Sequence, residues 1–149
     1  MTDRQRPGPS SVDDLADEER ALVAAALDAR AGAYAPYSGF HVGAALRLDD
    51  GTVVTGANVE NAAYPATICA ERVAVAYAVA HGTRSFAQLA VAGSGPDVCT
   101  PCGTCRQVLN EFAPRLDVLA TGDGGAVTRY VLDRDLLPDG FGPASLEEA

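Results

Sequence analysis

The spacing of four cysteines restricts the fold of this chain more than any other feature. Cys102 and Cys105 stand three residues apart, where a helix opened by Pro101 would make them neighbours. Cys69 opens a second predicted helix. Helix N-termini carry partial positive charge and favour the thiolate that binds metal. Three thiolates on two helix ends leave one position of a tetrahedral Zn²⁺ free, as in catalytic zinc sites.

The fourth cysteine leaves alternatives open, because Cys99-x-x-Cys102-x-x-Cys105 contains two overlapping pairs. Cys99 precedes the predicted helix, so its sulfur is less well placed than the other three. An iron–sulfur run would need a further cysteine where Leu109 stands. A redox pair would explain neither the distant Cys69 nor the acidic residue beside it. We therefore expect the metal ligands to be Cys69, Cys102 and Cys105.

The acidic residue is Glu71, two positions after Cys69. Side chains two apart on a helix point about 160° away from each other, so Glu71 is poorly placed to share the metal. From the first turn it can still lean over the open coordination position. A carboxylate there can move protons between water and a leaving group. An isolated Glu71 would merely be stabilised by the helix dipole; the nearby cysteines favour a catalytic role.

Composition and charge exclude several classes of function. Eleven Lys+Arg, all of them Arg, stand against 20 Asp+Glu, and the net charge of −9 opposes nucleic-acid binding. Apolar runs fall short of the roughly 20 residues that a membrane span needs, and the polar start is not a secretory signal. We expect a cytoplasmic protein with reduced cysteines and no membrane or nucleic-acid partner.

The order of predicted elements indicates the fold class. We expect strands over residues 40–48, 52–55, 86–92, 116–120 and 126–132. We expect helices from residue 13 or 14 to 34, over 69–81 and 101–112, and a short one over 133–137. This order predicts an α/β fold, a three-layer α-β-α sandwich with a five-stranded mixed sheet. Residues 1–12 are expected to form a flexible N-terminal tail, and residues 13–149 a single catalytic domain.

These motifs resemble a known family. Cys69-Ala70-Glu71-Arg72, together with residues 101–107 (PCGTCRQ), is similar to the zinc signature of the cytidine deaminases. The first ligand is Cys rather than His, as in the small, all-cysteine deaminases of free nucleosides. Residues 34–46 (YAPYSGFHVGAAL) and 56–64 (GANVENAAY) match the same family. The resemblance covers about residues 18–142 and implies a cytidine deaminase-like fold.

The resemblance implies zinc-dependent hydrolytic deamination of cytidine and 2′-deoxycytidine to uridine and 2′-deoxyuridine, a reaction of pyrimidine salvage. One Zn²⁺ per subunit would activate water for attack on C4 of the base, and Glu71 would carry the proton to N3 and then to the departing amine. Three thiolates exceed the charge of one Zn²⁺. Arg72 could offset this excess by donating hydrogen bonds to the ligand sulfurs; alternatively, it is a solvated helix charge.

The resemblance also assigns substrate contacts. Phe40 matches the aromatic ring that stacks on the pyrimidine, although alternation along its strand equally favours core packing. Asn58 and Glu60 match the pair that hydrogen-bonds the ribose 3′-hydroxyl, with Val59 between them in the same site. Ala70 would offer backbone groups to the edge of the base.

Three further positions imply an oligomer, since Ala62, Tyr64 and Phe141 match residues that reach into a neighbouring subunit's site in homotetramers of the family. Other functions remain in competition. The same zinc core could act on a nucleoside antibiotic of the blasticidin class. It could also act on cytosine in RNA or DNA, which the net charge opposes. A non-enzymatic binding module would hold structural zinc through four protein ligands.

Overall fold

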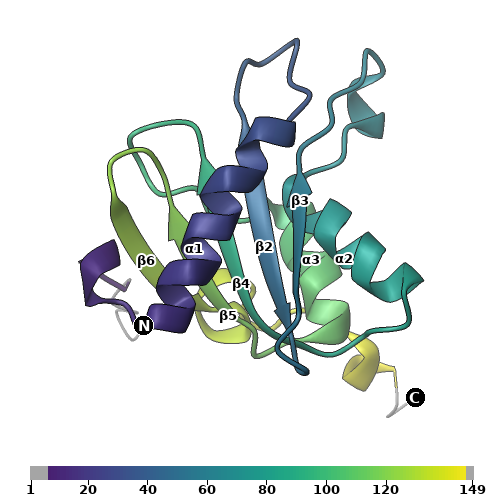
Figure 1. The fold of residues 1–149 in the computed structure, drawn as a ribbon. Coiled ribbons are helices and arrows are strands. Elements are labelled where there is room, and N and C mark those ends of the chain that lie inside the picture. The colour runs from purple at the N-terminus through teal and green to yellow at the C-terminus, as the bar shows by residue number, and fades with distance from the viewer. Residues whose placement is uncertain (1–6, 147–149) are drawn as a thin grey trace.

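Residues 7–146 are described by a computed structural model (Figure 1). Within them six strands form one sheet in the order β1-β6-β5-β4-β2-β3. Only the β4–β5 pair of this sheet is parallel. The strands are β1 (Ser10–Ser11), β2 (Val42–Leu48), β3 (Val53–Ala57), β4 (Phe86–Gly93), β5 (Asp117–Thr121) and β6 (Ala126–Val131). The α-helices are α1 (Asp17–Ala29), α2 (Ala70–Ala80) and α3 (Gly103–Phe112).

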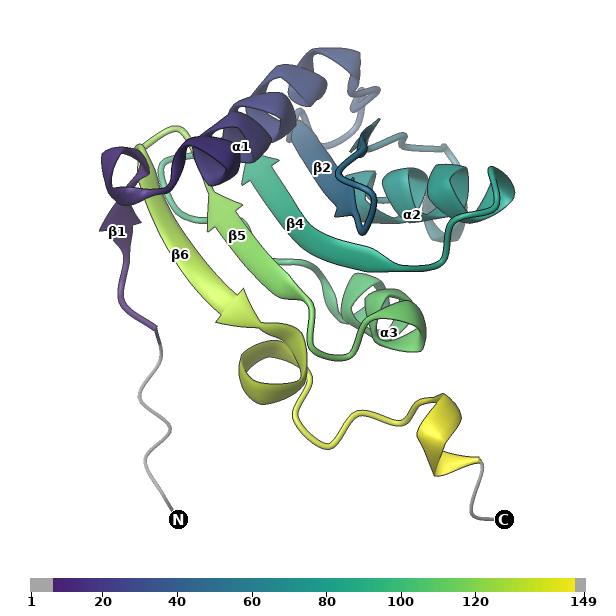
Figure 2. The ribbon, with the colours of Figure 1, turned by 60° about the horizontal axis from the view of Figure 1, so that its bottom comes forward.

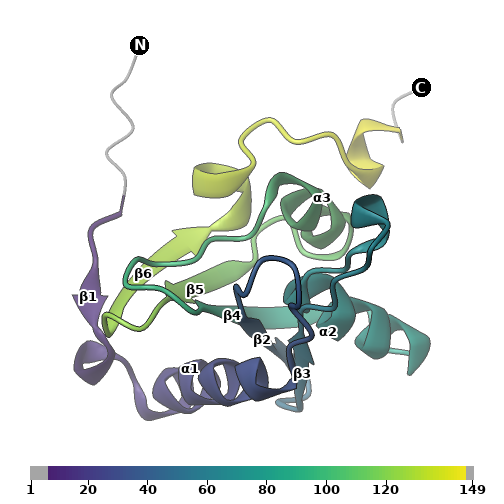
Figure 3. The ribbon, with the colours of Figure 1, turned by 90° about the horizontal axis from the view of Figure 1, so that it is seen from above.

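Helix α1 covers one face of the sheet (Figure 3). Small residues on this face let the helix approach closely, and a Cβ atom at Gly43 would lie 2.0 Å from the carbonyl oxygen of Ala26. The helix contributes Leu22 and Val23 to the core on this side, against Ala45 of β2. Because side chains alternate along a strand, the neighbours of Ala45 point to the opposite face.

Helices α2 and α3 cover that opposite face (Figure 3). Their core is larger, and it includes Ala74 of α2 and Leu109 of α3 against Leu46 and Leu89 of the sheet. The amphipathic pattern of α3 follows from this packing, because one stripe of the helix meets the sheet while the rest faces solvent. The sheet therefore separates α1 from the two helices that begin with cysteines.

The topology brings the starts of α2 and α3 together. Strand β3 is antiparallel to β2, which is antiparallel to β4, so β3, β4 and β5 run in the same direction. The segments β3–α2–β4 and β4–α3–β5 are therefore two crossovers that share β4 (Figure 2). Each helix begins at the edge where its preceding strand ends. In open α/β sheets, ligands bind at this carboxyl edge.

The expected α/β fold with a mixed sheet is confirmed, but the expected number of five strands is wrong. The sixth strand is β1, whose Ser10 and Ser11 pair with Val127 and Ala126 on the edge strand β6. The two serines pair with β6 through their backbone, and the Ser10 hydroxyl donates to the carbonyl oxygen of Val127. Neither serine is apolar, so the sequence shows no alternating pattern that would predict this strand. Of the expected flexible tail, residues 1–6 lie outside the described part of the chain, whereas Ser10 and Ser11 belong to the sheet.

Helix boundaries differ from expectation at both ends of the chain. Helix α1 does not begin at residue 13 or 14, because Ser11 caps a separate 3₁₀ turn (Val12–Asp14) and the chain then extends at Leu15 to bury this side chain. It ends at Ala29 and continues as a 3₁₀ turn, Arg30–Gly32. The short helix expected over residues 133–137 is a single π-helical turn, Leu132–Leu136.

Two further 3₁₀ turns, Tyr64–Ala66 and Pro143–Ser145, lie in the loop before α2 and near the C-terminal end. The hairpin turn between β2 and β3 forms where expected, with Gly51 at a φ of 87°. Within residues 7–146, each helix is too short or too polar to cross a membrane.

The contact between β3 and α2 gives a first testable prediction. A Cβ atom at Gly56 would lie 2.3 Å from the carbonyl oxygen of Ala70 and 2.8 Å from the backbone nitrogen of Ala74. Because both atoms belong to the helix backbone, Gly56→Ala must push the start of α2 away from the sheet. We expect the free energy of unfolding to fall by about 1–3 kcal/mol in a thermal or denaturant melt.

The matched control is Gly32→Ala, whose Cβ would meet only the Cβ of Ala57 at an ordinary 3.7 Å. The melting temperature of this control is expected to lie within about two degrees of that of the wild type, because such a substitution usually changes the free energy of unfolding by less than about 0.5 kcal/mol. Equal stability of the Gly56→Ala and Gly32→Ala proteins would contradict the tight packing of α2 on β3.

Candidate metal centre

Three sulfur atoms converge where α2 and α3 begin. The Sγ atoms of Cys69, Cys102 and Cys105 all lie within 4.8 Å of one another, and those of Cys69 and Cys102 are 3.8 Å apart. Ligands at the Zn–S distance of about 2.3 Å in a tetrahedron lie about 3.8 Å apart. The sulfur spacing therefore fits one zinc ion, and the three ligands predicted from the sequence are brought together.

Two of the three cysteines are helix N-caps. Cys69 and Cys102 have extended backbone conformations immediately before α2 and α3. The Cys102 sulfur accepts a hydrogen bond from the backbone nitrogen of Cys105 at 3.5 Å, in the position where a serine or asparagine side chain would otherwise cap the helix. The Cys69 side chain accepts no such capping bond at the start of α2. Both helix N-termini nevertheless place partial positive charge near the sulfurs, which favours thiolates.

Arg72 stabilises negative charge on the cluster. Its Nη2 atom donates to the Cys69 sulfur at 3.7 Å and to the carbonyl oxygen of Thr67 at 3.2 Å. The pKa of Cys69 is lowered to about 5, mainly by a hydrogen bond from the Cys105 thiol and to a smaller extent by the hydrogen bond from Arg72. The thiol of Cys105 has a raised pKa, because it donates to Cys69 and is buried. One sulfur is therefore a thiolate at neutral pH before any metal binds.

Glu71 lies in the first turn of α2 beside these sulfurs, and only 3% of its surface is exposed. Burial, and after it the negative charge on Cys69, raises the pKa of this carboxyl from its ordinary value of 4.5 to about 7. Hydrogen bonding to the Cys105 thiol and the positive charge of Arg72 act in the opposite direction. A carboxyl with a pKa near 7 can both accept and release a proton at neutral pH.

Cys99 lies outside the three-sulfur cluster. Its side chain packs over Gly93 at the end of β4, and burial followed by the charge on Glu71 raises its pKa to about 11. The sulfur of Cys99 is not one of the three that lie close enough together to share one ion. The structure therefore favours the ligand set without Cys99, and among the described residues this set leaves the fourth zinc position without a protein sulfur.

The residues assigned to the base lie near this centre. Phe40 is 42% exposed, and its ring reaches over Gly93, whose other neighbour is Cys99. Phe40 is thus not a core residue in this chain. The alternative that its side chain packs in the core, which the alternating pattern of residues 40–48 favours, is wrong. Ala70 is fully buried at the first position of α2.

The two polar residues assigned to the ribose also organise the backbone around Phe40. Asn58 is buried, and its amide accepts from the nitrogen of Val42 at 2.8 Å and donates to the carbonyl oxygen of Phe40 at 2.9 Å. The Glu60 carboxylate accepts from the backbone nitrogens of Tyr37 and Ser38 and from the Ser38 hydroxyl. The hydroxyl bond from Ser38 is the main cause of the lowered pKa of Glu60.

Val59 joins this loop to the start of α2. It exchanges two backbone hydrogen bonds with Ile68, at 2.9 and 3.0 Å, while its side chain stays exposed. Ala62, Tyr64 and Phe141 are exposed as well. Tyr64 packs edge-on against Tyr37 with 5.8 Å between ring centroids. These three residues are not drawn into the metal centre of their own chain.

Arg106 has a structural role that the sequence analysis did not assign. Its guanidinium donates to the carbonyl oxygens of Pro101 and Leu136 and to the Thr100 hydroxyl. These bonds fix the segment that carries Cys102 against the C-terminal part of the chain. In the sequence Arg106 directly follows the ligand Cys105. Its structural role could not be predicted, because two of its acceptors are backbone carbonyl oxygens, which every residue carries.

The sheet with its three-sulfur centre defines a zinc-binding α/β protein. Residues 16–121 match the family model described as the cytidine and deoxycytidylate deaminase zinc-binding region, which is more than half of the chain. The matched part includes Cys69, Glu71, Cys102 and Cys105. The chain belongs to the cytidine and deoxycytidylate deaminase family.

Individual relatives agree with this assignment. A cytidine deaminase from Halalkalibacterium halodurans is 41% identical over 124 residues, covering 83% of this chain and 94% of the relative. A cytidine deaminase from Mycobacterium tuberculosis (strain H37Rv) is 48% identical over 121 residues, covering 78% and 84%. The crystal structure of cytidine deaminase from Burkholderia pseudomallei has a TM-score of 0.79 and 50% identity, and the match covers 82% of this chain and 98% of that chain.

The ligand set gives a second testable prediction. Replacing Cys69, Cys102 or Cys105 by Ala should abolish stoichiometric zinc, because two remaining sulfurs cannot hold the ion against chelators. The matched control is Cys99→Ala, which removes a sulfur from the same region and should keep one zinc per chain. Zinc content would be measured by inductively coupled plasma mass spectrometry after dialysis against a chelator. Loss of zinc from the control alone would overturn the assignment.

Proposed function

We propose that this protein is a zinc-dependent cytidine deaminase that hydrolyses cytidine and 2′-deoxycytidine to uridine and 2′-deoxyuridine with release of ammonia. The observation that carries the proposal is the buried Glu71 carboxyl, with a pKa of about 7, beside three sulfurs spaced for one zinc ion. Family membership and relatives named as cytidine deaminases support this substrate class. The reaction is that of pyrimidine salvage.

The zinc ligands are Cys69, Cys102 and Cys105. In an open three-ligand site, zinc acidifies water so that it becomes a nucleophile near neutral pH. Arg72 lowers the basicity of the Cys69 thiolate through its hydrogen bond, and this offsets the surplus negative charge of three thiolates. The helix N-termini of α2 and α3 add positive partial charge at the same place.

Glu71 is the proton carrier in this proposal. A carboxylate at this position takes the proton that water loses as it attacks C4 of the cytosine ring, and delivers it to N3. The second proton, from the hydroxyl group now on C4, would go through the same carboxyl to the amino group; the C4–N bond then breaks, and ammonia leaves as the C4 carbonyl forms. The pKa near 7 suits both directions of transfer, because neither protonation state of Glu71 is scarce at neutral pH.

Substrate recognition is assigned to the residues around Phe40. The exposed ring of Phe40 would stack on the pyrimidine, and Ala70 would offer backbone groups to the base edge. Asn58, Val59 and Glu60 would hold the ribose. The bonds that Asn58 and Glu60 already make leave each with unused hydrogen-bonding capacity, since an amide has two N–H donors and a carboxylate about four acceptor sites. The net charge of −9 disfavours RNA or DNA as substrate.

The proposed reaction gives a third testable prediction. Glu71→Gln keeps the shape of the side chain, but an amide cannot carry the proton. Turnover of cytidine should therefore fall by about 10²-fold to 10⁴-fold. The zinc content should stay at one ion per chain. Turnover would be followed as the ultraviolet absorbance change on conversion of cytidine to uridine.

A matched control separates catalysis from general effects of charge removal. Glu111→Gln makes the same change at an exposed position of α3 and should keep turnover within about twofold, as surface changes usually do. A zinc-loaded Glu71→Gln protein with undiminished activity would refute the proton-carrier role. If the wild type does not deaminate cytidine while holding zinc, a non-enzymatic zinc module would be the better description.

The proposal extends to the assembly. Tyr64 and Phe141 are large aromatic side chains that are exposed in the single chain. Contact with a neighbouring subunit's site would explain why they are exposed. We expect light scattering with size-exclusion chromatography to give four times the 15.3 kDa chain mass. Tyr64→Ala and Phe141→Ala should raise KM for cytidine, whereas Tyr77→Ala, which removes another exposed ring on the far part of α2, should not. A monomer with full activity would contradict this part of the proposal.

A further inference from the structure

The ring of Phe40 rests on bare backbone. A Cβ atom at Gly93 would lie 2.8 Å from Cζ of Phe40, and one at Gly95 would lie 3.6 Å from Cε2 of the same ring. Residues 93–95, which we call the 93–95 shelf, thus support the ring edge without side chains of their own at the two glycines. Any movement of the shelf moves the surface on which the ring lies.

One side of the shelf is bonded to the segment that carries the ring, which directly precedes β2. The backbone nitrogen of Ser94 donates to the carbonyl oxygen of His41 at 2.8 Å, and the backbone nitrogen of His41 donates to the Ser94 hydroxyl at 2.8 Å. His41 directly follows Phe40. The ring and the shelf are therefore held in one register by two short hydrogen bonds.

The other side of the shelf is held by an ion pair. The Nη1 atom of Arg30 donates to the carbonyl oxygen of Gly93 at 2.8 Å and to Oδ1 of Asp123 at 2.7 Å. The backbone nitrogen of Asp123 donates to the carbonyl oxygen of Gly95 at 2.6 Å. Arg30 and Asp123, which we call the Arg30–Asp123 clamp, thus bond both ends of the shelf and each other.

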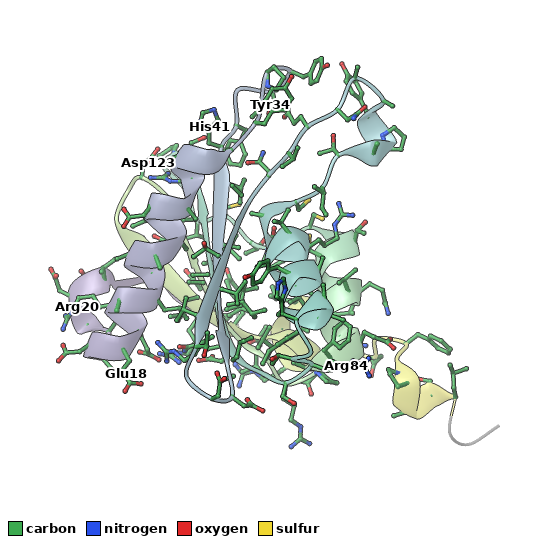
Figure 4. All side chains as sticks on the ribbon, turned by 45° about the vertical axis from the view of Figure 1, so that its right-hand side comes forward. Glu18, Arg20, Tyr34, His41, Arg84 and Asp123 are labelled. Carbon is green, nitrogen blue, oxygen red and sulfur yellow. The ribbon has the colours of Figure 1, made fainter. Side chains whose placement is uncertain are left out.

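The clamp lies away from the chemistry. Arg30 begins the turn that follows α1, and α1 covers the face of the sheet opposite to α2 and α3. Figure 4 shows Asp123 and His41 near the same end of the molecule, whereas Glu18 lies at the other end of α1. The Arg30 side chain is only 20% exposed, so its charged hydrogen bonds are partly shielded from water.

We propose that Arg30 is a positioning residue for substrate binding, which acts through the 93–95 shelf on the ring of Phe40. The inference rests on the proposed function, because it concerns the ring that would stack on the pyrimidine. Stacking is made in the ground state and in the transition state alike, so a displaced ring should weaken binding and leave the proton transfers of Glu71 unchanged. The signature of Arg30 is therefore a change in KM without a change in kcat.

The test compares R30M with R47M. Both arginines donate from partly buried side chains to a backbone carbonyl, since the Arg47 side chain is 18% exposed and bonds the carbonyl oxygen of Glu18. Both variants should lose similar stability. With base–aromatic stacking as the guide, R30M should raise KM for cytidine about fivefold to twentyfold, with kcat within about twofold. R47M should change neither, and both should keep one zinc per chain.

Rescue and binding measurements separate positioning from general damage. R30K keeps the charge and one donor for the Gly93 carbonyl, and should bring KM back to within about threefold of the wild type. In the Glu71→Gln background cytidine is consumed about 10²-fold to 10⁴-fold more slowly, so calorimetric titration can give its Kd directly. Adding R30M should weaken this binding by the same factor by which it raises KM. D123A should raise KM less than R30M, and the two should not be additive if they act as one clamp.

The outcomes are distinct. An unchanged KM and Kd in R30M, with wild-type turnover of cytidine intact, would overturn the positioning role and leave the proposed function standing. Equal KM increases in R30M and R47M would also overturn it, because they would reflect lost stability alone. Absence of cytidine turnover in the wild type would instead refute the proposed function itself.

Discussion

The structure depends on the convergence of two helix N-termini at the carboxyl edge of the sheet. Strand β4 is shared by two crossovers, so α2 and α3 must begin side by side on one face. Cysteines at both caps and in the first turn of α3 then place three sulfurs within 4.8 Å. The metal centre is thus a consequence of topology, and small residues such as Gly56 let α2 sit close enough for the sulfurs to meet.

The same convergence sets the electrostatics around the sulfurs. Helix N-termini and Arg72 favour a thiolate at Cys69, and burial together with this negative charge raises the pKa of Glu71 to about 7. Burying a carboxyl is costly, and the proton transfer that we propose for Glu71 would explain a buried carboxyl beside the three sulfurs. On the opposite face of the sheet, α1 packs on alanines and Gly43.

Much of this arrangement could be predicted from the sequence. The starts of α2 and α3 fall within two residues of the predicted positions, because the cysteines, the Pro before Cys102 and the apolar runs are local signals. The sixth strand could not be predicted, since the pairing of Ser10 with Val127 depends on an edge formed 117 residues later. Nor could the roles of Arg30 and Arg106, because their main acceptors are backbone carbonyls, which every residue carries.

The measurement that tests the central claim most directly is zinc K-edge X-ray absorption on the purified protein. The structure predicts three sulfur scatterers at about 2.3 Å and one oxygen or nitrogen scatterer near 2.0 Å, the pattern of a site with one open position. Four sulfur scatterers would mean that Cys99 closes the site and that the centre is structural. That result would contradict the account of how this protein works.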